Sequence, residues 1–128
     1  MKSSSFTILF MEDDLGLQKV YEGSFSSEGY QVIVAAHGAR ALADLKDREI
    51  DLLVADLSMP GMNTLELLKI LKREHPRLPV IVVAGHPVNL SEASILEGID
   101  VKAFFTKPVV VSELAQKIRQ ILKIDDVQ

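Results

Sequence analysis

The sequence contains no cysteine, which excludes a disulfide scaffold, a thiol nucleophile and a cysteine metal site and fits a reducing compartment. No apolar run approaches the roughly 20 residues that a membrane-spanning helix needs. Its 14 basic residues form no cluster and are outnumbered by 18 acidic residues, so the chain is a poor candidate for binding nucleic acid. The N-terminal stretch leads directly into a strand-like segment, unlike a signal peptide. We therefore expect a soluble, cytoplasmic protein that binds neither nucleic acid nor membranes.

What the sequence does have is the balance of an ordinary globular domain. It is 48% hydrophobic and 25% charged over 128 residues, a length that suits one domain with a real core. We expect a single domain spanning residues 1–128 with its core at about residues 6–123. Residues 1–5 and 125–128 lack apolar periodicity, and we expect these ends to be flexible.

Five short apolar runs recur along the chain and predict five β-strands. They show little alternation, which is typical of strands that are buried on both faces of a parallel sheet. Lys102 interrupts the fifth run and favours an edge position for it. The runs cover residues 6–11, 31–35, 50–55, 79–84 and 101–106.

Segments with helical spacing separate these runs. Apolar residues at positions 17, 20, 21 and 25 share one face of a first helix, and Gly29 is placed to end it. The second and third helices are predicted at about residues 39–46 and 64–74. Asn89 or Ser91 is placed to cap a fourth helix and Gly98 to end it, and positions 114, 118, 121 and 122 define a fifth.

Five consecutive strand–helix units predict an α/β fold with a doubly wound, five-stranded parallel sheet, a flavodoxin-like (βα)5 arrangement. Parallel strands need crossover helices, and these crossovers are right-handed. We expect the strand order 2-1-3-4-5, which is usual for a small domain of this pattern. Ligands of such sheets bind beyond the C-terminal ends of the strands.

Acidic residues and one lysine follow the strands at that end. Glu12 and Asp13 follow the first run, Asp56 the third and Lys107 the fifth. Because neighbouring carboxylates about 4 Å apart repel by about 4 kcal/mol at an effective dielectric near 20, they need a cation, and their hard oxygens suit Mg²⁺. A carboxylate can act as a nucleophile and form an aspartyl phosphate. Lys107 and the backbone N–H of Gly85 are placed to bind phosphoryl oxygens.

Three motifs, in this order, resemble those of response regulator receiver domains (CheY-like) of two-component systems. The segment ILFMEDD at residues 8–14 resembles the first strand and its acidic pair. The segment DLLVADLSMPGM at residues 51–62 resembles the surroundings of the phosphoacceptor. The segment FTKP at residues 105–108 resembles the active-site lysine segment, so that the resemblance covers nearly the whole chain.

The resemblance implies a role for each residue at these strand ends. Asp56 would be the phosphoacceptor and Lys107 the active-site lysine. Glu12, Asp13 and Asp56 would bind Mg²⁺ together with the backbone carbonyl of Ser58, and Asp14 would be the more variable neighbour.

The resemblance also implies partners. The phosphoryl group would come from a sensor histidine kinase or a phosphotransfer protein. A face built from the fourth helix, the fifth strand and the fifth helix would contact a downstream protein or output domain, and the sequence leaves a homodimer open. Such a domain catalyses its own phosphorylation but is no metabolic enzyme.

The sequence departs from the family pattern at three positions. Ala84 stands where Thr or Ser usually bonds the phosphoryl group, and a hydrogen bond to a charged group is worth about 1.5–3 kcal/mol. Phe104 occupies the position of the switch aromatic but lacks a hydroxyl group. Thr64 stands where Gly is usual, and we expect Asn63 to adopt the left-handed conformation instead. We therefore expect that Asp56 accepts phosphate while the conformational response is altered.

Other functions stay open at this stage. Ala84 also suits a degenerate receiver that docks to proteins without being phosphorylated. A Mg²⁺-dependent phosphohydrolase of the haloacid dehalogenase type would need a second Asp where Ser58 stands. A flavin or nucleotide carrier would need Gly, Ser or Thr after the first strand, where this chain is acidic.

Single residues also have simpler interpretations. The acidic run at residues 12–14 could be a solvated turn before a helix, and Lys107 could be a surface lysine. Phe104 could fill an edge of the core. The three histidines are scattered and predict no metal site.

The resemblance also implies a role for Ser58 and His86, because residues at these positions in the family tune the hydrolysis of the aspartyl phosphate.

Overall fold

The computed structural model describes residues 6–59 and 64–122 of the chain. Within them, five parallel strands form one sheet in the order β2-β1-β3-β4-β5, as predicted. The strands are β1 (Thr7–Met11), β2 (Gln31–Ala35), β3 (Leu52–Asp56), β4 (Val80–Ala84) and β5 (Val101–Thr106). The helices are α1 (Leu15–Ser26), α2 (Gly38–Asp47), α3 (Thr64–Glu74), α4 (Leu90–Leu96) and α5 (Val111–Leu122).

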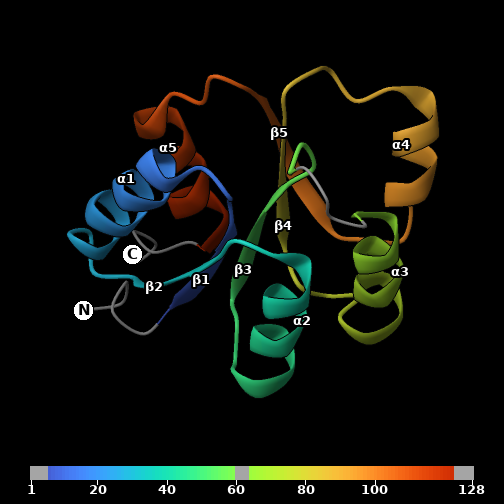
Figure 1. Ribbon diagram of the computed structural model, residues 1–128, viewed down its shortest axis with the longest axis horizontal. Helices are drawn as coiled ribbons and strands as arrows, with labels where there is room; N and C mark the ends of the chain where they lie inside the picture. The colour runs from blue at the N-terminus through green and yellow to red at the C-terminus, as the bar shows by residue number, and fades with distance from the viewer. Residues whose placement is uncertain (1–5, 60–63, 123–128) are drawn as a thin grey trace.

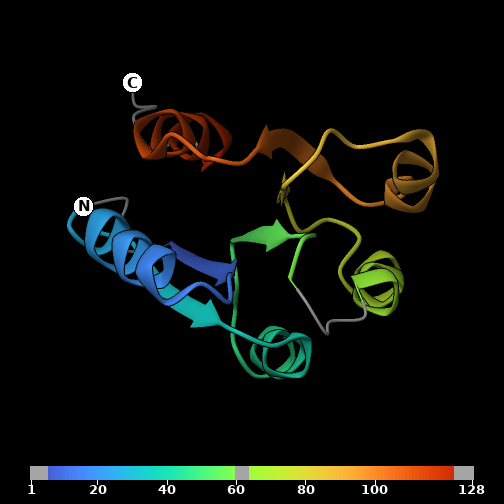
Figure 2. The same cartoon turned by 45° about the horizontal axis from the view of Figure 1, so that its top comes forward.

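The sheet lies between two layers of helices. Figures 1 and 2 show α1 and α5 on one face of the sheet and α2, α3 and α4 on the other. Side chains that alternate along β1 and β3 enter two separate hydrophobic clusters, one under each layer. This burial on both faces explains why β1, β3 and β4 read as nearly continuous apolar runs in the sequence.

The core under α1 and α5 contains an aromatic group. The rings of Phe10 and Tyr21 stack with their centroids 4.6 Å apart, and Phe25 lies 5.1 Å from Phe10. All three side chains are buried. The packing fixes α1 against β1, and therefore also positions the loop that joins them.

Local sequence signals set the ends of several helices. The Asp14 side chain accepts a hydrogen bond from the Leu17 N–H at 2.8 Å and caps α1. Gly29 and Gly98, both predicted to end helices, have φ values of 99° and 90°, which favour glycine.

The strand and helix boundaries differ from the predictions by only a few residues. The third strand begins at Leu52 and ends at Asp56, whereas the apolar run predicted residues 50–55. Asp51 lies just outside the strand, and its carboxylate accepts a hydrogen bond from the Thr7 N–H at 2.7 Å. The predictions for the chain ends and for Asn63 lie outside the described residues.

Among the residues that the structure describes, no helix has the length and apolar character needed to cross a membrane. The strand β5 forms one edge of the sheet, as Lys102 indicated. Its side chains alternate between half-buried and exposed, whereas β3 and β4 are buried throughout.

Candidate functional site

The C-terminal ends of β1, β3 and β5 bring the predicted charged residues together. Parallel pairing of β1 with both β2 and β3 places Glu12 and Asp56 at the same edge of the sheet. Carboxylate oxygens of Glu12, Asp13 and Asp56 all lie within 4.8 Å of one another. Glu12 and Asp56 are each only 1% exposed, whereas Asp13 is exposed to solvent.

Lys107 approaches these acids from β5. Its Nζ atom donates a hydrogen bond to Asp56 Oδ2 at 2.6 Å and lies 3.7 Å from Glu12 Oε2. Its backbone N–H donates to the Ala84 carbonyl at 2.8 Å, which ties the end of β5 to the end of β4. The lysine is therefore held over the two buried carboxylates and is not a free surface lysine.

The acidic run at residues 12–14 divides into three different environments. The Glu12 N–H donates to the Ala35 carbonyl, and its own carbonyl accepts a hydrogen bond from Gln18 Nε2 at 2.7 Å. Its carboxylate accepts a hydrogen bond from the Asp14 N–H at 3.1 Å. Because Glu12 is buried, the alternative of a solvated acidic turn is wrong for this residue.

The electrostatics of the cluster reflect burial and uneven charge. Burial raises the pKa of Glu12, and although the Asp14 N–H lowers it, the charge of Asp56 raises it again, so that the pKa lies above its usual value. Partial burial alone would lower the pKa of Lys107, but the hydrogen bond to Asp56 and the surrounding acids raise it. Burial, with smaller contributions from Glu12 and Asp56, raises the pKa of Tyr21 to about 12.

The cluster fits a divalent cation. Three carboxylates lie close together, and Lys107 pairs with those of Glu12 and Asp56 and neutralises one negative charge, so a charge near −2 is left at the sheet edge. Oxygen ligands, one of them open to water, suit Mg²⁺ because this ion keeps several waters when bound. Glu12, Asp13 and Asp56 are the side chains that would hold it.

Ser58 joins the loops that follow β3 and β4. Its backbone N–H donates to Asp56 Oδ1 at 2.8 Å. Its hydroxyl oxygen accepts a hydrogen bond from the Gly85 N–H at 2.7 Å. The neighbouring Ala84 is buried and brings no polar side-chain atom to this edge.

Phe104 points away from the core. Its side chain is 55% exposed, so the interpretation that it fills the core edge is wrong. His86, which follows Gly85, is also exposed. Both residues lie where the sequence placed them, on β5 and after β4.

Sequence reasoning missed three features of the site. Asp14 was predicted to be the variable neighbour of the acidic pair and not a helix cap, although Asp directly before an apolar helical pattern is a standard capping signal. The hydrogen bond of the Ser58 hydroxyl gave no sequence signal. The sequence also gave no sign that the buried hydroxyl of Tyr21 lacks a hydrogen-bond partner within the described part of the chain.

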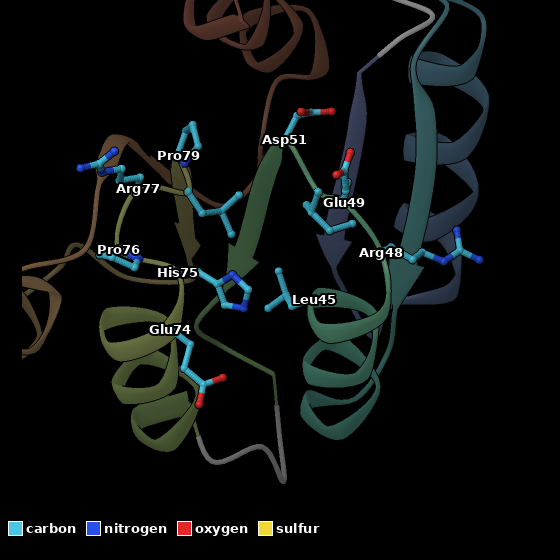
Figure 3. Close-up of a pocket in the computed structure, with 11 residues that line it drawn as sticks. Leu45, Arg48, Glu49, Asp51, Glu74, His75, Pro76, Arg77 and Pro79 are labelled. Atoms are coloured by element: carbon cyan, nitrogen blue, oxygen red, sulfur yellow. The ribbon is translucent and has the colours of Figure 1, made fainter.

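A pocket of about 570 Å³ lies at the opposite end of the sheet, between the C-terminal ends of α2 and α3 (Figure 3). Residues 45, 48–51 and 74–79 line it. The His75 ring and the Leu45 side chain face each other, whereas Arg48 and Arg77 point away from the pocket. Since these residues precede β3 and β4, the pocket is separate from the acidic cluster.

Comparison with known sequences gives a consistent result. Residues 8–119 match the family described as response regulator receiver domain. The transcriptional regulatory protein CpxR of Escherichia coli (strain K12) is 37% identical over 116 residues, which are 91% of this chain and 49% of that protein. The transcriptional regulatory protein GlrR of the same strain is 34% identical over 91% of this chain and 26% of that protein. The chain thus spans between a quarter and a half of the length of these relatives.

Solved structures agree with this result. A response regulator receiver domain protein (CheY-like) from Methanospirillum hungatei JF-1 superimposes with a TM-score of 0.82 at 27% identity, over 92% of this chain and 94% of that one. The receiver domain of the TMAO respiratory system response regulator TorR superimposes with a TM-score of 0.80 at 29% identity, over 92% and 97% of the two chains.

Proposed function

Because this chain belongs to the response regulator receiver domain family, we propose that it accepts a phosphoryl group on Asp56 and acts as a Mg²⁺-dependent signalling switch. Receiver domains of two-component regulators are phosphoryl-accepting switches rather than metabolic enzymes. One observation carries the proposal. The Asp56 carboxylate is buried at the strand end, 2.6 Å from Lys107 Nζ and within 4.8 Å of two further carboxylates.

We infer that Asp56 is the nucleophile. One of its carboxylate oxygens would form a bond to phosphorus while the bond between phosphorus and the donor's imidazole nitrogen breaks, and the electron pair of that bond would leave with the imidazole. Lys107 is already beside Asp56 Oδ2 and would offset the negative charge of the phosphoryl oxygens. The Gly85 N–H and the Ser58 N–H lie on the same edge and would supply further donors.

Glu12, Asp13 and Asp56 would hold Mg²⁺, together with the Ser58 backbone carbonyl. When bound, the ion supplies positive charge that favours phosphoryl transfer. Receiver domains in general bind Mg²⁺, and the carboxylate cluster of this chain matches that need.

Response regulator receivers work with histidine kinases and output domains. We propose that a sensor histidine kinase or a phosphotransfer protein is the donor for this chain. The downstream partner would contact the face formed by α4, β5 and α5, where Phe104 is exposed.

The proposal is tested by incubating the protein with Mg²⁺ and acetyl phosphate and measuring its intact mass. We expect the mass of one phosphoryl group to be added, and we expect no addition to Asp56→Asn or when Mg²⁺ is chelated. Asp100→Asn is the matched control because Asp100 pairs with Lys102, away from the cluster. A phosphoryl group that persists in Asp56→Asn would refute the assignment.

The alternative of a degenerate receiver rests on Ala84. The buried methyl group at this position cannot replace a hydroxyl group as a hydrogen-bond donor. If the wild-type protein gains no phosphoryl mass in Mg²⁺ but still binds its partner, it acts as a docking module that does not depend on phosphorylation.

If the protein is phosphorylated, we expect Ser58 and His86 to tune the lifetime of the phosphoryl group. An unchanged rate of dephosphorylation after both are substituted would refute that role.

A further inference from the structure

The hydroxyl group of Ser58 occupies a donor that a phosphoryl group on Asp56 would need. Ser58 Oγ accepts the Gly85 N–H at 2.7 Å, while the backbone N–H of the same serine donates to Asp56 Oδ1 at 2.8 Å. These two bonds form a continuous link from the Asp56 carboxylate to the first residue after β4. The link therefore joins the loop after β3 to the loop after β4.

The serine side chain lies directly beside Gly85, at ordinary van der Waals distance. A Cβ atom placed on Gly85 would meet Ser58 Oγ at 3.4 Å and Ser58 Cβ at 4.0 Å. The serine side chain thus covers the side of Gly85 that faces the loop after β3. Ala84 ends β4 with a methyl group and offers no polar atom that could bind a phosphoryl oxygen in place of this amide.

A phosphoryl group on Asp56 would compete with the serine for the Gly85 N–H. Phosphoryl oxygens are charged acceptors, and their hydrogen bonds are roughly twice as strong as bonds between neutral groups. The neutral hydroxyl of Ser58 would therefore lose the Gly85 N–H to the phosphoryl group. Both loops are exposed at this point, so the hydroxyl group can turn toward solvent when it is displaced.

We propose that the Ser58 hydroxyl is an internal competitor that locks the Gly85 amide in the unphosphorylated state and releases it to the phosphoryl group. Breaking this hydrogen bond separates the loop after β4 from the loop after β3. Because the loop after β4 leads into α4, this separation transmits the phosphorylated state to α4. The inference rests on the proposed function, because it assigns the regulation of the same site. It gives the domain a way to respond although Ala84 lacks a hydroxyl group.

The lock has a measurable cost. The wild-type protein must break one hydrogen bond before the Gly85 N–H can bind a phosphoryl oxygen, whereas Ser58→Ala exposes this N–H to water in advance. The net contribution of this hydrogen bond is small because both groups can form hydrogen bonds with water instead. Its loss corresponds to about a two- to tenfold change in affinity. We therefore expect Ser58→Ala to bind a phosphoryl analogue about two- to tenfold more tightly.

The experiment is a titration of beryllofluoride in saturating Mg²⁺ into the wild-type protein, Ser58→Ala, Ser58→Thr and Thr106→Val. Ser58→Thr keeps the hydroxyl group and should bind like the wild type. Thr106→Val removes a hydroxyl group at the end of β5, directly opposite Ala84 in the sheet register, and should also bind like the wild type. The affinity for Mg²⁺ alone is measured for each protein, so that the beryllofluoride titrations are compared at equal occupancy of the metal site.

Amide hydrogen exchange of Gly85 provides the second measurement. We expect the Gly85 amide to exchange faster in unliganded Ser58→Ala than in the unliganded wild type, and to reach similar protection in both after beryllofluoride is added. Equal beryllofluoride affinities and equal Gly85 exchange rates in the wild type and Ser58→Ala would refute the proposed competition. Weaker binding by Ser58→Ala would also overturn it, since the serine would then be a donor to the phosphoryl group. If no variant binds beryllofluoride and Asp56 gains no phosphoryl mass, the proposed function itself fails.

Discussion

Replacing Asp13 by asparagine should stabilise the metal-free protein and remove most of its response to Mg²⁺. The side chain of Asp13 is exposed, and its carboxylate lies within 4.8 Å of those of Glu12 and Asp56. The substitution changes the charge with almost no change of shape. It therefore isolates the electrostatic part of the site from its packing.

The expected magnitude follows from the distance. Two unit charges at 4.8 Å, the upper limit of the separations in this cluster, repel by about 3.5 kcal/mol at an effective dielectric of 20. Solvent around Asp13 and the attraction of Lys107 reduce this strongly, so we expect a net gain of about 1 kcal/mol in the free energy of unfolding without metal. At a free Mg²⁺ concentration ten times its dissociation constant, binding adds about 1.4 kcal/mol to the wild type. Asp13→Asn should lose most of this increment because it loses a charged ligand.

The assay is urea unfolding followed by circular dichroism, with and without Mg²⁺. Asp14→Asn is the matched control. It removes the same charge one residue further on, and asparagine still caps α1. Its response to Mg²⁺ should equal that of the wild type. If Asp13→Asn is no more stable without metal and still gains the full increment from Mg²⁺, the three carboxylates do not act as one cation site.

Three other predictions concern Lys107 and Tyr21. Replacing Lys107 by alanine leaves the buried carboxylates of Asp56 and Glu12 without the positive charge that they pair with. The free energy of unfolding, measured by urea titration in the presence of a chelator, should therefore fall by about 2–4 kcal/mol. A fall of less than about 0.5 kcal/mol would contradict the pairing. Tyr21→Phe removes a buried hydroxyl without a partner in the described part of the chain and should raise stability at pH 7 by about 1 kcal/mol; a clear loss in denaturant unfolding would mean that the hydroxyl is bonded. The pKa of Tyr21 is about 12 in the folded protein against 10.0 for an unperturbed tyrosine, so ionisation of this residue favours unfolding as the pH rises from 10 to 12. Unfolding titrations across this range should show a smaller alkaline loss of stability for Tyr21→Phe than for the wild type.

The fold and the location of the site could both be predicted from the pattern of residues along the chain. Its apolar runs are short and show little alternation because both faces of the sheet are covered, and this pattern is visible without coordinates. Parallel strands place all their C-terminal ends at one edge. Charged residues after the first, third and fifth runs therefore had to meet there, and the structure brings Glu12, Asp13, Asp56 and Lys107 together at that edge.

The contacts of each polar group at that edge could not be predicted in this way. Three consecutive acids look alike in the sequence, but the end of β1 buries Glu12, leaves Asp13 in solvent and turns Asp14 toward the helix it caps. Phe104 could have pointed either way, because an edge strand leaves one of its faces only partly covered. The bond between Ser58 and Gly85 joins loops 27 residues apart. Such contacts depend on the direction of each side chain and on the path of two loops, and hydrophobic periodicity carries no information about either.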